Sequence, residues 1–288
     1  MKFLVCIDGS PRSLDALPHA AKLASATGAE LVVMRVLDPR TDAAHIVAPE
    51  LETALKQVEA TWTAELESQV SAANVPGSAM VVRREWSKQT ADAISAAAGE
   101  AGVTLIALSS RGHGAIRHAL LGSVAMGVIS RGADPVMTTG GRIQPPSGSA
   151  GYHLVITSDG SPDARSVFEG LRPLLAGTSV RVTLLEVVTP RLGESDAAAK
   201  LRSTENLSAL TSRLPEGIHA GFEVRIAPPG AGIDTAIVTA ARELGADAIA
   251  MATHGHSARR HLVAGSTALG VLGATEVPVI LVKSRPVE

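Results

Sequence analysis

The chain has 288 residues, 45% of them apolar and 19% charged, and a formal net charge of −2. So small a charge argues against binding nucleic acid mainly through its phosphates, and no apolar run approaches the length of a membrane span. The single cysteine excludes an intrachain disulfide and a cysteine-based zinc site. We expect a cytoplasmic globular protein with no secretory leader and no association with membranes.

Apolar runs alternate with helical patterns through the first half of the chain. Strands are expected at residues 3–7, 30–37, 80–83, 104–108 and 135–137, and helices at 13–27, 49–75 and 90–101. The longest helix carries apolar residues along one face: Leu51, Leu55, Val58, Trp62 and Leu66. This alternation predicts right-handed crossovers between parallel strands and therefore an α/β fold.

The second half of the chain repeats the first. Its strands are expected at 153–158, 182–188, 247–251 and 278–282, and its long helix at 195–214. Residues 93–122 align with the second half without a gap at an offset of 143, whereas Asp8 and Asp159 are 151 residues apart. Such a long period indicates a duplicated domain. Because residues 140–151 show no periodicity, we expect domains at 1–140 and 152–288 joined by a linker at 141–151.

A glycine loop occurs once in each half, between an expected strand and an expected helix. In each copy a glycine is followed by nine residues and then by Gly-Ser, which makes the pairs Gly112 and Gly255, Gly122 and Gly265, and Ser123 and Ser266. Backbone N–H groups at the start of a helix can bind a phosphate. We expect Ser123 to cap the following helix and to donate its hydroxyl to the ligand.

A second motif, Asp-Gly-Ser-Pro, follows the first strand of each half and begins at Asp8 and at Asp159. Ligands of open parallel sheets sit beyond the carboxyl ends of the strands, where the winding direction reverses. We therefore expect each carboxylate turn to face the glycine loop of its own half. Neither a P-loop nor a complete Gly-x-Gly-x-x-Gly is present, which argues against those two phosphate motifs.

Basic residues cluster inside both loops: Arg111, His113, Arg117, His118, His254, His256, Arg259, Arg260 and His261. Such clusters are typical of charge compensation for a polyphosphate and equally of a solvated loop. We expect no metal site of the protein's own, because Arg111 stands where the second loop has His254. Catalysis has little support, since neither Asp8 nor Asp159 has a second acid, base or nucleophile at a telling spacing, and Cys6 lies in an expected buried strand where thiols are inert.

These motifs together resemble the universal stress protein family in its tandem, two-domain form. The resemblance covers nearly everything outside the linker and the long helices. It implies two Rossmann-like domains of the adenine nucleotide alpha hydrolase type, each a five-stranded parallel sheet flanked by helices. It also implies binding of ATP or AMP, and Mg²⁺ can accompany ATP. The resemblance further implies that the two halves pair as a pseudo-dimer through their last strands, and it leaves open a homodimer of two chains.

The resemblance also assigns site residues by position. The phosphates would be held by Gly112, Gly122 and Ser123 in the first half and by Gly255, Gly265 and Ser266 in the second. The adenosine would be bordered by Ile7, Asp8, Ser158 and Asp159, and the adenine by Val36 and Val187. The shell would be completed by Leu108, Val124, Met251 and Thr267.

One position departs from the family pattern, because its first glycine is Ser109 in one half and Ala252 in the other. We expect weakened or altered binding there, not its abolition. Three hypotheses follow: a stress-response protein acting through nucleotide-dependent conformation or partner binding, a slow ATP hydrolase or adenylate-transferring enzyme, and a scaffold that binds no nucleotide. The first is favoured by the doubled loop and its paired Asp-Gly-Ser turns.

Overall fold

The computed structural model describes residues 1–42, 48–110, 121–132, 134–148, 151–228, 230–253 and 264–283. In the first half, strands and helices alternate as β1 (Lys2–Ile7), α1 (Ala16–Thr27), β2 (Glu30–Leu37), α2 (Pro39–Asp42), α3 (Ala48–Ala72), β3 (Gly77–Arg83), α4 (Thr90–Ala101), β4 (Leu105–Ser109), α5 (Ser123–Arg131) and β5 (Val136–Thr139). A short 3₁₀ turn at Pro11–Asp15 leads into α1. The expected strands and helices of this half are confirmed to within a few residues at each end.

The second half repeats this order without the small helix. It consists of β6 (His153–Ser158), α6 (Pro162–Leu175), β7 (Arg181–Val188), α7 (Asp196–Leu210), β8 (Ala220–Ile226), α8 (Ile233–Glu243), β9 (Ala248–Ala252), α9 (Ser266–Ala274) and β10 (Val279–Val282). A 3₁₀ turn at Thr211–Arg213 follows α7. None of the helices in the described part of the chain is both long and apolar enough to cross a membrane.

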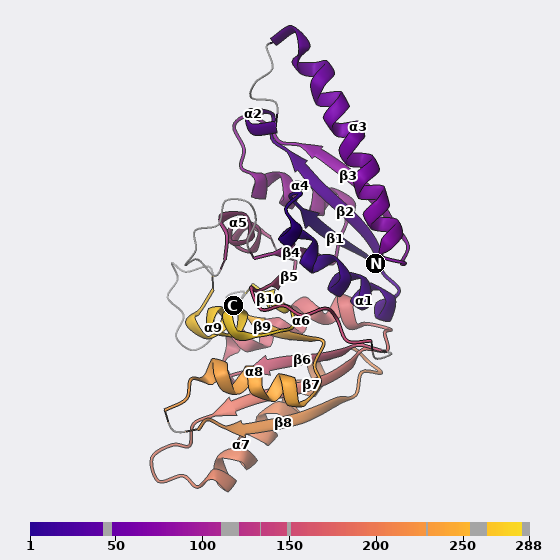
Figure 1. Ribbon diagram of the computed structural model, residues 1–288. Coiled ribbons are helices and arrows are strands. Elements are labelled where there is room, and N and C mark those ends of the chain that lie inside the picture. Colours follow the sequence, from indigo (N-terminus) through magenta and orange to yellow (C-terminus); the bar gives the residue numbers. More distant parts are fainter. Residues whose placement is uncertain are drawn as a thin grey trace.

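All ten strands form one sheet in the order β3-β2-β1-β4-β5-β10-β9-β6-β7-β8. The strands of each half run parallel to their neighbours, and the two halves meet where β5 and β10 pair antiparallel, with Ile280 opposite Met137. Figure 1 shows the halves on either side of this central pair. The pairing of the two halves through their last strands is confirmed.

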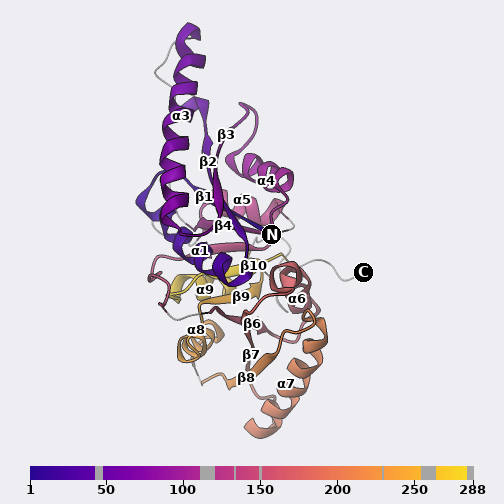
Figure 2. The ribbon, with the colours of Figure 1, turned by 90° about the vertical axis from the view of Figure 1, so that its right-hand side faces the viewer.

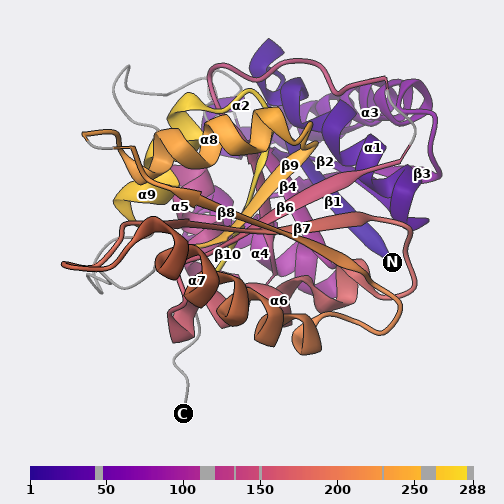
Figure 3. The same ribbon diagram turned by 90° about the horizontal axis from the view of Figure 1, so that it is seen from below.

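Helices cover both faces of the sheet in two layers. Side chains of α1, α3, α6 and α7 share one buried apolar cluster with the sheet, and those of α4, α5, α8 and α9 share another. Figure 2 shows α3 and α4 on opposite sides of β2 and β3, and Figure 3 shows β6, β7 and β8 between the pairs α6–α7 and α8–α9. Each half is therefore a doubly wound α/β layer structure.

Strand order within each half places the reversal of winding between its first and fourth strands. In the first half β1 pairs with β2 on one side and with β4 on the other, and in the second half β6 pairs with β7 and β9. A crevice forms beyond the carboxyl ends of strands at such a point. The fold therefore brings the ends of β1 and β4, and of β6 and β9, beside one another.

Candidate functional site

Each half has a cavity beyond the carboxyl ends of its strands. We call the cavity of about 340 Å³ in the first half the N-terminal pocket and the cavity of about 440 Å³ in the second half the C-terminal pocket. The N-terminal pocket is lined by the predicted residues Ile7, Asp8, Val36, Leu108, Gly122, Ser123 and Val124. The C-terminal pocket is lined by Ser158, Asp159, Val187, Met251, Gly265, Ser266 and Thr267. Every predicted site residue that the structure describes thus lies on the wall of the pocket in its own half.

Two predicted residues, Gly112 and Gly255, lie outside the described residues. So do the basic residues of both loops, from Arg111 to His118 and from His254 to His261. Their predicted roles therefore stay predictions. Ser109 and Ala252, which replace the first glycine of the family pattern, each line the pocket of their half.

The Asp-Gly-Ser turns have the same geometry in both halves. The Ser10 N–H donates to Asp8 Oδ1 at 2.9 Å, and the Ser161 N–H donates to Asp159 Oδ1 at 3.0 Å. Gly9 adopts a φ of +82°, a conformation that side chains with a Cβ rarely allow. Each aspartate is consequently fixed at the end of its strand with its carboxylate at the pocket wall.

The serines of these turns start the next helical segment. Ser10 Oγ accepts a hydrogen bond from the Ser13 N–H at 3.2 Å, and Ser161 Oγ accepts one from the Ala164 N–H at 3.1 Å. Such caps satisfy a backbone donor that the first helical turn leaves without a partner. These hydroxyls therefore have a structural role, which is to cap the start of the next helical segment.

The helix after each glycine loop begins at the pocket. Gly122 is the N-cap of α5 and Gly265 is the N-cap of α9, and neither cap has a side-chain hydrogen bond. The Gly122 N–H donates to the Ser110 carbonyl at 2.7 Å, and the Gly265 N–H donates to the Thr253 carbonyl at 2.6 Å. These bonds tie each helix start to the segment that follows the fourth strand.

The prediction that Ser123 caps this helix is wrong. Ser123 is the first residue of α5 itself, and the cap position belongs to Gly122 with an extended backbone at φ −73° and ψ 163°. A side-chain cap needs its oxygen one residue earlier. As a result, no N-cap side chain accepts a hydrogen bond from the first N–H groups of α5. Ser123, the first residue of this helix, lines the pocket wall.

A helix start of this kind is a site for an anion. The first N–H groups of a helix have no partner within the helix, and its dipole places partial positive charge there. Residues 122–125 of α5 and 265–268 of α9 all line their pockets. Each pocket thus combines a carboxylate at one wall with a helix N-terminus at another.

Comparisons with known proteins agree with this architecture. The model of the universal stress protein family matches residues 1–139 and again residues 153–283. The chain belongs to the universal stress protein family. A universal stress protein of Synechocystis sp. is 28% identical to it over 298 residues, which covers 96% of this chain and 98% of the relative.

Solved structures are similar over the whole tandem chain. A universal stress protein from Archaeoglobus fulgidus aligns with 100% of this chain and 97% of its own, with a TM-score of 0.67 and 21% identity. A protein of unknown function from Pseudomonas aeruginosa aligns with 98% of this chain and 92% of its own, with a TM-score of 0.60 and 16% identity. These likenesses show the fold that this universal stress protein shares with them.

The N-terminal pocket of this universal stress protein is also lined by an arginine and a tryptophan that were not predicted to belong to the site. The guanidinium of Arg35, on β2, lies 3.4 Å from the centroid of the Trp62 ring, on α3, which is a cation–π contact. Arg35 Nη1 lies 3.5 Å from Glu65 Oε2. Burial is the main cause that lowers the pKa of Arg35 from its ordinary value. A lone charged residue near the end of an apolar strand was the signal that could have found it.

Acidic residues at the end of β2 border the same pocket. Asp38 and Asp42 both line it, and the Asp38 N–H donates to Asp42 Oδ2 at 2.7 Å. Arg84, whose side chain is only 3% exposed, forms an ion pair with Asp38. The charge of Asp38 is therefore compensated from beneath the pocket, whereas Asp42 belongs to the short helix α2 at its rim.

The C-terminal pocket has a different set of charges. Glu186 on β7, Arg191 after it and Arg202 on α7 all line the wall. Arg202 Nε and Nη2 each donate to Glu194 at 3.0 Å, and this pair lowers the pKa of Glu194 to about 2. Glu186 is only 4% exposed. The two pockets therefore share their backbone plan but not their charges.

Cys6 lies at the base of the N-terminal pocket. Burial raises the pKa of its thiol to about 12, so the thiol stays protonated at neutral pH. Thiolates, not thiols, are nucleophiles and metal ligands. In the part of the chain that the structure describes, no group of three or more histidine, cysteine, aspartate or glutamate side chains could hold a metal ion.

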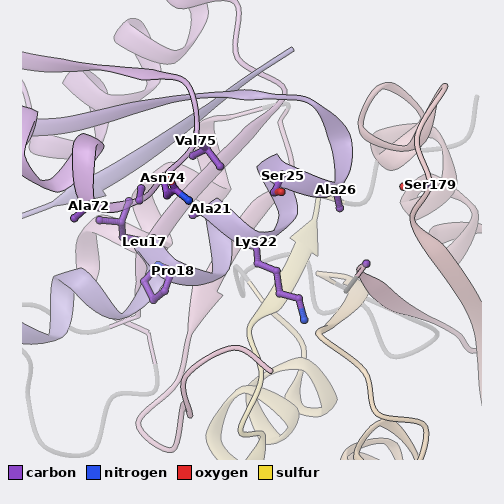
Figure 4. A pocket seen from close by; sticks show the side chains of 12 residues that line it. Leu17, Pro18, Ala21, Lys22, Ser25, Ala26, Ala72, Asn74, Val75 and Ser179 are labelled. Atoms are coloured by element: carbon purple, nitrogen blue, oxygen red, sulfur yellow. The ribbon is translucent and has the colours of Figure 1, made fainter. Parts of the chain in front are cut away.

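A third cavity, of about 610 Å³, lies between the two halves. Figure 4 shows its lining side chains, which come from α1, from the end of α3 and from Ser179 of the second half. Most of them are small or apolar, and the charged one, Lys22, is in an ion pair with Asp247 at 2.7 Å. This cavity therefore lacks the converging polar groups of the two pockets.

Proposed function

We propose that this universal stress protein binds an adenine nucleotide, ATP or AMP, in one or both of its pockets. One observation carries the proposal: in both halves the aspartate turn and the Gly-Ser helix start line the same cavity. Volumes of about 340 and 440 Å³ lie within the range of roughly 300–1,000 Å³ that small-molecule sites occupy.

In this proposal one part of each pocket wall contacts the adenine base and another part contacts the phosphates. Val36 and Val187 lie at the ends of their strands and offer an apolar surface to the adenine. Asp8 and Asp159 border the adenosine, because their carboxylates can accept hydrogen bonds from hydroxyl or amino groups. The starts of α5 and α9, with Ser123 and Ser266, face the phosphates.

The remaining predicted residues complete this arrangement. Ile7, Leu108 and Val124 in the N-terminal pocket, and Ser158, Met251 and Thr267 in the C-terminal pocket, stand on the walls between these two ends. Gly112 and Gly255 belong to the proposed phosphate contacts. A Mg²⁺ ion would enter with ATP on its phosphates, where it offsets part of their charge.

The proposed biological role follows from the binding of nucleotide, not from its turnover. Asp8 and Asp159 each accept a hydrogen bond from the serine N–H of their own turn, an arrangement that holds a wall in place. We propose a cytoplasmic stress-response protein whose conformation or partner binding depends on the bound nucleotide. Both pockets belong to one continuous sheet, and we propose this sheet as the physical connection between them.

Calorimetric titration with ATP and Mg²⁺ tests the proposal. A Cβ on Gly122 would lie 3.1 Å from the Ser110 carbonyl oxygen, and one on Gly265 would lie 3.4 Å from the Thr253 carbonyl oxygen. The first distance is tight and the second is an ordinary contact, but the two methyl groups of a valine extend beyond its Cβ and would take up space at the walls that Gly122 and Gly265 line. We expect binding by the wild type, loss of one pocket in each single variant, and no binding by Gly122→Val combined with Gly265→Val.

Gly148→Val is the matched control, since Gly148 is exposed and a Cβ there would meet nothing within 4 Å. It should bind ATP as the wild type does. Wild-type protein that releases no heat with millimolar ATP would rule the proposal out and favour a scaffold that binds no nucleotide. Unchanged binding by the folded double variant would place the nucleotide elsewhere.

A further inference from the structure

The two pockets carry opposite charges at one equivalent position. In the sheet, Arg35 of β2 is paired with Ile7 of β1, and Glu186 of β7 is paired with Ser158 of β6. The two residues are 151 positions apart, as are the aspartates of the two turns. Duplication has therefore left a cation in one half where the other half has an anion.

Both side chains reach the turn that follows the first strand. A Cβ built on Gly9 would lie 2.6 Å from Arg35 Nη2, and one built on Gly160 would lie 4.0 Å from Glu186 Oε1. Arg35 lines the N-terminal pocket together with Asp8, and Glu186 lines the C-terminal pocket together with Asp159. The same part of a ligand would meet a guanidinium in one pocket and a carboxylate in the other.

The neighbours of these two residues preserve the difference. Arg35 is oriented by the ring of Trp62 at 3.4 Å, and its carboxylate neighbour Glu65, at 3.5 Å, has a side chain that is 60% exposed. An exposed ion pair at this distance is weak. The Asp8 and Asp42 carboxylates also act on Arg35, so the cation is held at the pocket wall, where its side chain is 19% exposed.

In the C-terminal pocket the arginine that acts on Glu186 is also paired with another carboxylate. Arg202 acts on Glu186 electrostatically, but its guanidinium donates two hydrogen bonds of 3.0 Å to Glu194. Such a bidentate pair satisfies the fork of an arginine. Glu186, which is 4% exposed, places carboxylate oxygens, which only accept hydrogen bonds, beside the turn, whereas Arg35 places donors there.

We propose that the two pockets discriminate between nucleotides by the state of the ribose, an inference that rests on the proposed function. Arg35 makes the N-terminal pocket accept a ribose that carries a phosphate on its 2′ or 3′ oxygen. Glu186 makes the C-terminal pocket select a free ribose diol and exclude that phosphate.

The chemistry of the two side chains supports this division. A guanidinium has only donors, in a planar fork that matches phosphate oxygens. A carboxylate accepts hydrogen bonds from hydroxyls but repels a second anion. In other doubly wound sheets, an acidic residue binds the ribose hydroxyl and an arginine accommodates a phosphate at the same place. The aspartate turn, at which both residues lie, is the adenosine end of each proposed site.

The test compares 5′-AMP with adenosine 3′,5′-bisphosphate and adenosine 2′,5′-bisphosphate by calorimetry. Gly265→Val leaves the N-terminal pocket to be measured alone, and Gly122→Val leaves the C-terminal pocket. For each pocket the ratio of bisphosphate affinity to 5′-AMP affinity is determined. We expect this ratio to be at least about tenfold higher in the N-terminal pocket for one of the two bisphosphates, the size of one charge-assisted hydrogen bond.

Variants of Arg35 and Glu186 test whether these two side chains cause the difference in bisphosphate preference between the pockets. Arg35→Gln should lower the ratio of bisphosphate affinity to 5′-AMP affinity in the N-terminal pocket about tenfold. Arg35→Lys should keep part of the preference because it keeps the charge. Glu186→Gln should raise the affinity of the C-terminal pocket for the bisphosphate. Melting temperatures near that of the wild type show that each variant is folded.

The inference would be overturned if the ratio of bisphosphate affinity to 5′-AMP affinity were equal in the two pockets, or if it did not change in Arg35→Gln and Glu186→Gln. In either case the binding of 5′-AMP would still support the proposed function. Loss of 5′-AMP binding from both pockets of the wild type would instead overturn the proposed function, and the inference with it.

Discussion

Two of the histidines that the structure describes are buried, one in each half of the chain. His19 and His153 are each 3% exposed. The ring of His19 donates from Nε2 to the Gln144 carbonyl at 2.9 Å, and Arg181 Nη2 lies 2.8 Å from Nδ1 of His153. Burial, chiefly, lowers the pKa of both rings in the folded protein.

These rings should make the protein sensitive to acid. A histidine whose pKa is lowered by folding binds its proton more readily in the unfolded chain, so the free energy of unfolding rises with pH where the two states differ. It should therefore be fully retained above the unfolded pKa of about 6.5 and fall as the pH drops below it. The charged groups that face these rings are Lys22 and Asp247 at His19, and Arg181 and Asp247 at His153.

Urea unfolding at pH 7.5 and pH 5.5 measures this effect. His19→Gln keeps a donor for the Gln144 carbonyl but removes the titrating ring, so it should lose less stability on acidification than the wild type. His219→Gln is the matched control, because His219 is exposed, and should lose as much as the wild type. An identical loss in His19→Gln and wild type would contradict this account.

Close approach between helices is set by a glycine in each half. A Cβ on Gly127 of α5 would lie 2.5 Å from the Cβ of Ala91 on α4, a separation that real Cβ atoms do not adopt. In the second half Gly270 of α9 faces Asp234 of α8 in the same way. These glycines let the helix that begins at each pocket rest directly against its neighbour.

Gly127→Ala should therefore destabilise the protein by about 1–3 kcal/mol, as overpacking of a core does. Gly99→Ala is the matched control within α4, since a Cβ there would meet nothing within 4 Å. It should stabilise the helix by about 0.5–1 kcal/mol because alanine loses less backbone entropy than glycine. Chemical unfolding of both variants measures the difference, and equal stabilities would show that α4 and α5 do not pack as closely as described.

The alternation of apolar runs was enough to predict every described strand except β8 (Ala220–Ile226), the long helix of each half and the duplication. Trp62 was correctly assigned to the apolar face of the long helix, which packs Leu55 against Leu37. Its contact with Arg35 joins residues on different elements, and a pattern within one element carries no information about such a pair. Sequence spacing also could not decide whether Gly122 or Ser123 is the N-cap of α5, because that depends on the backbone angles at one residue.

The candidate site was predictable to a similar depth. Two motifs, both expected at the carboxyl ends of strands, were sufficient to place the pocket walls, because strand order dictates which ends meet. The charges that distinguish the two pockets were not foreseen. Arg35 and Glu186 each interrupt an apolar strand, and only the pairing of β2 with β1 and of β7 with β6 shows that they occupy the same place.

The whole molecule is held together by more than the pairing of β5 with β10. Lys22 of α1 forms an ion pair with Asp247 of the second half at 2.7 Å, with side chains 14% and 8% exposed. Ser147, between the halves in sequence, donates to Asp247 Oδ1 at 2.9 Å, and the His153 N–H donates to Asp247 Oδ2 at 2.9 Å. Breaking a buried pair of this kind leaves a charge uncompensated. The contacts at Asp247 therefore help to join the two halves, and with them the two pockets, into one body.

Native mass spectrometry of the purified chain, equilibrated with ATP and Mg²⁺, tests the central claim most directly because it counts nucleotides on each molecule. We expect one or two ATP masses on the wild type, and at most one on Gly122→Val or on Gly265→Val. The variant that combines both substitutions, and that keeps the wild-type fold by circular dichroism, should carry none. A wild-type chain that stays bare up to millimolar ATP, or a folded double variant that binds as the wild type does, would contradict the assignment of nucleotide to these pockets.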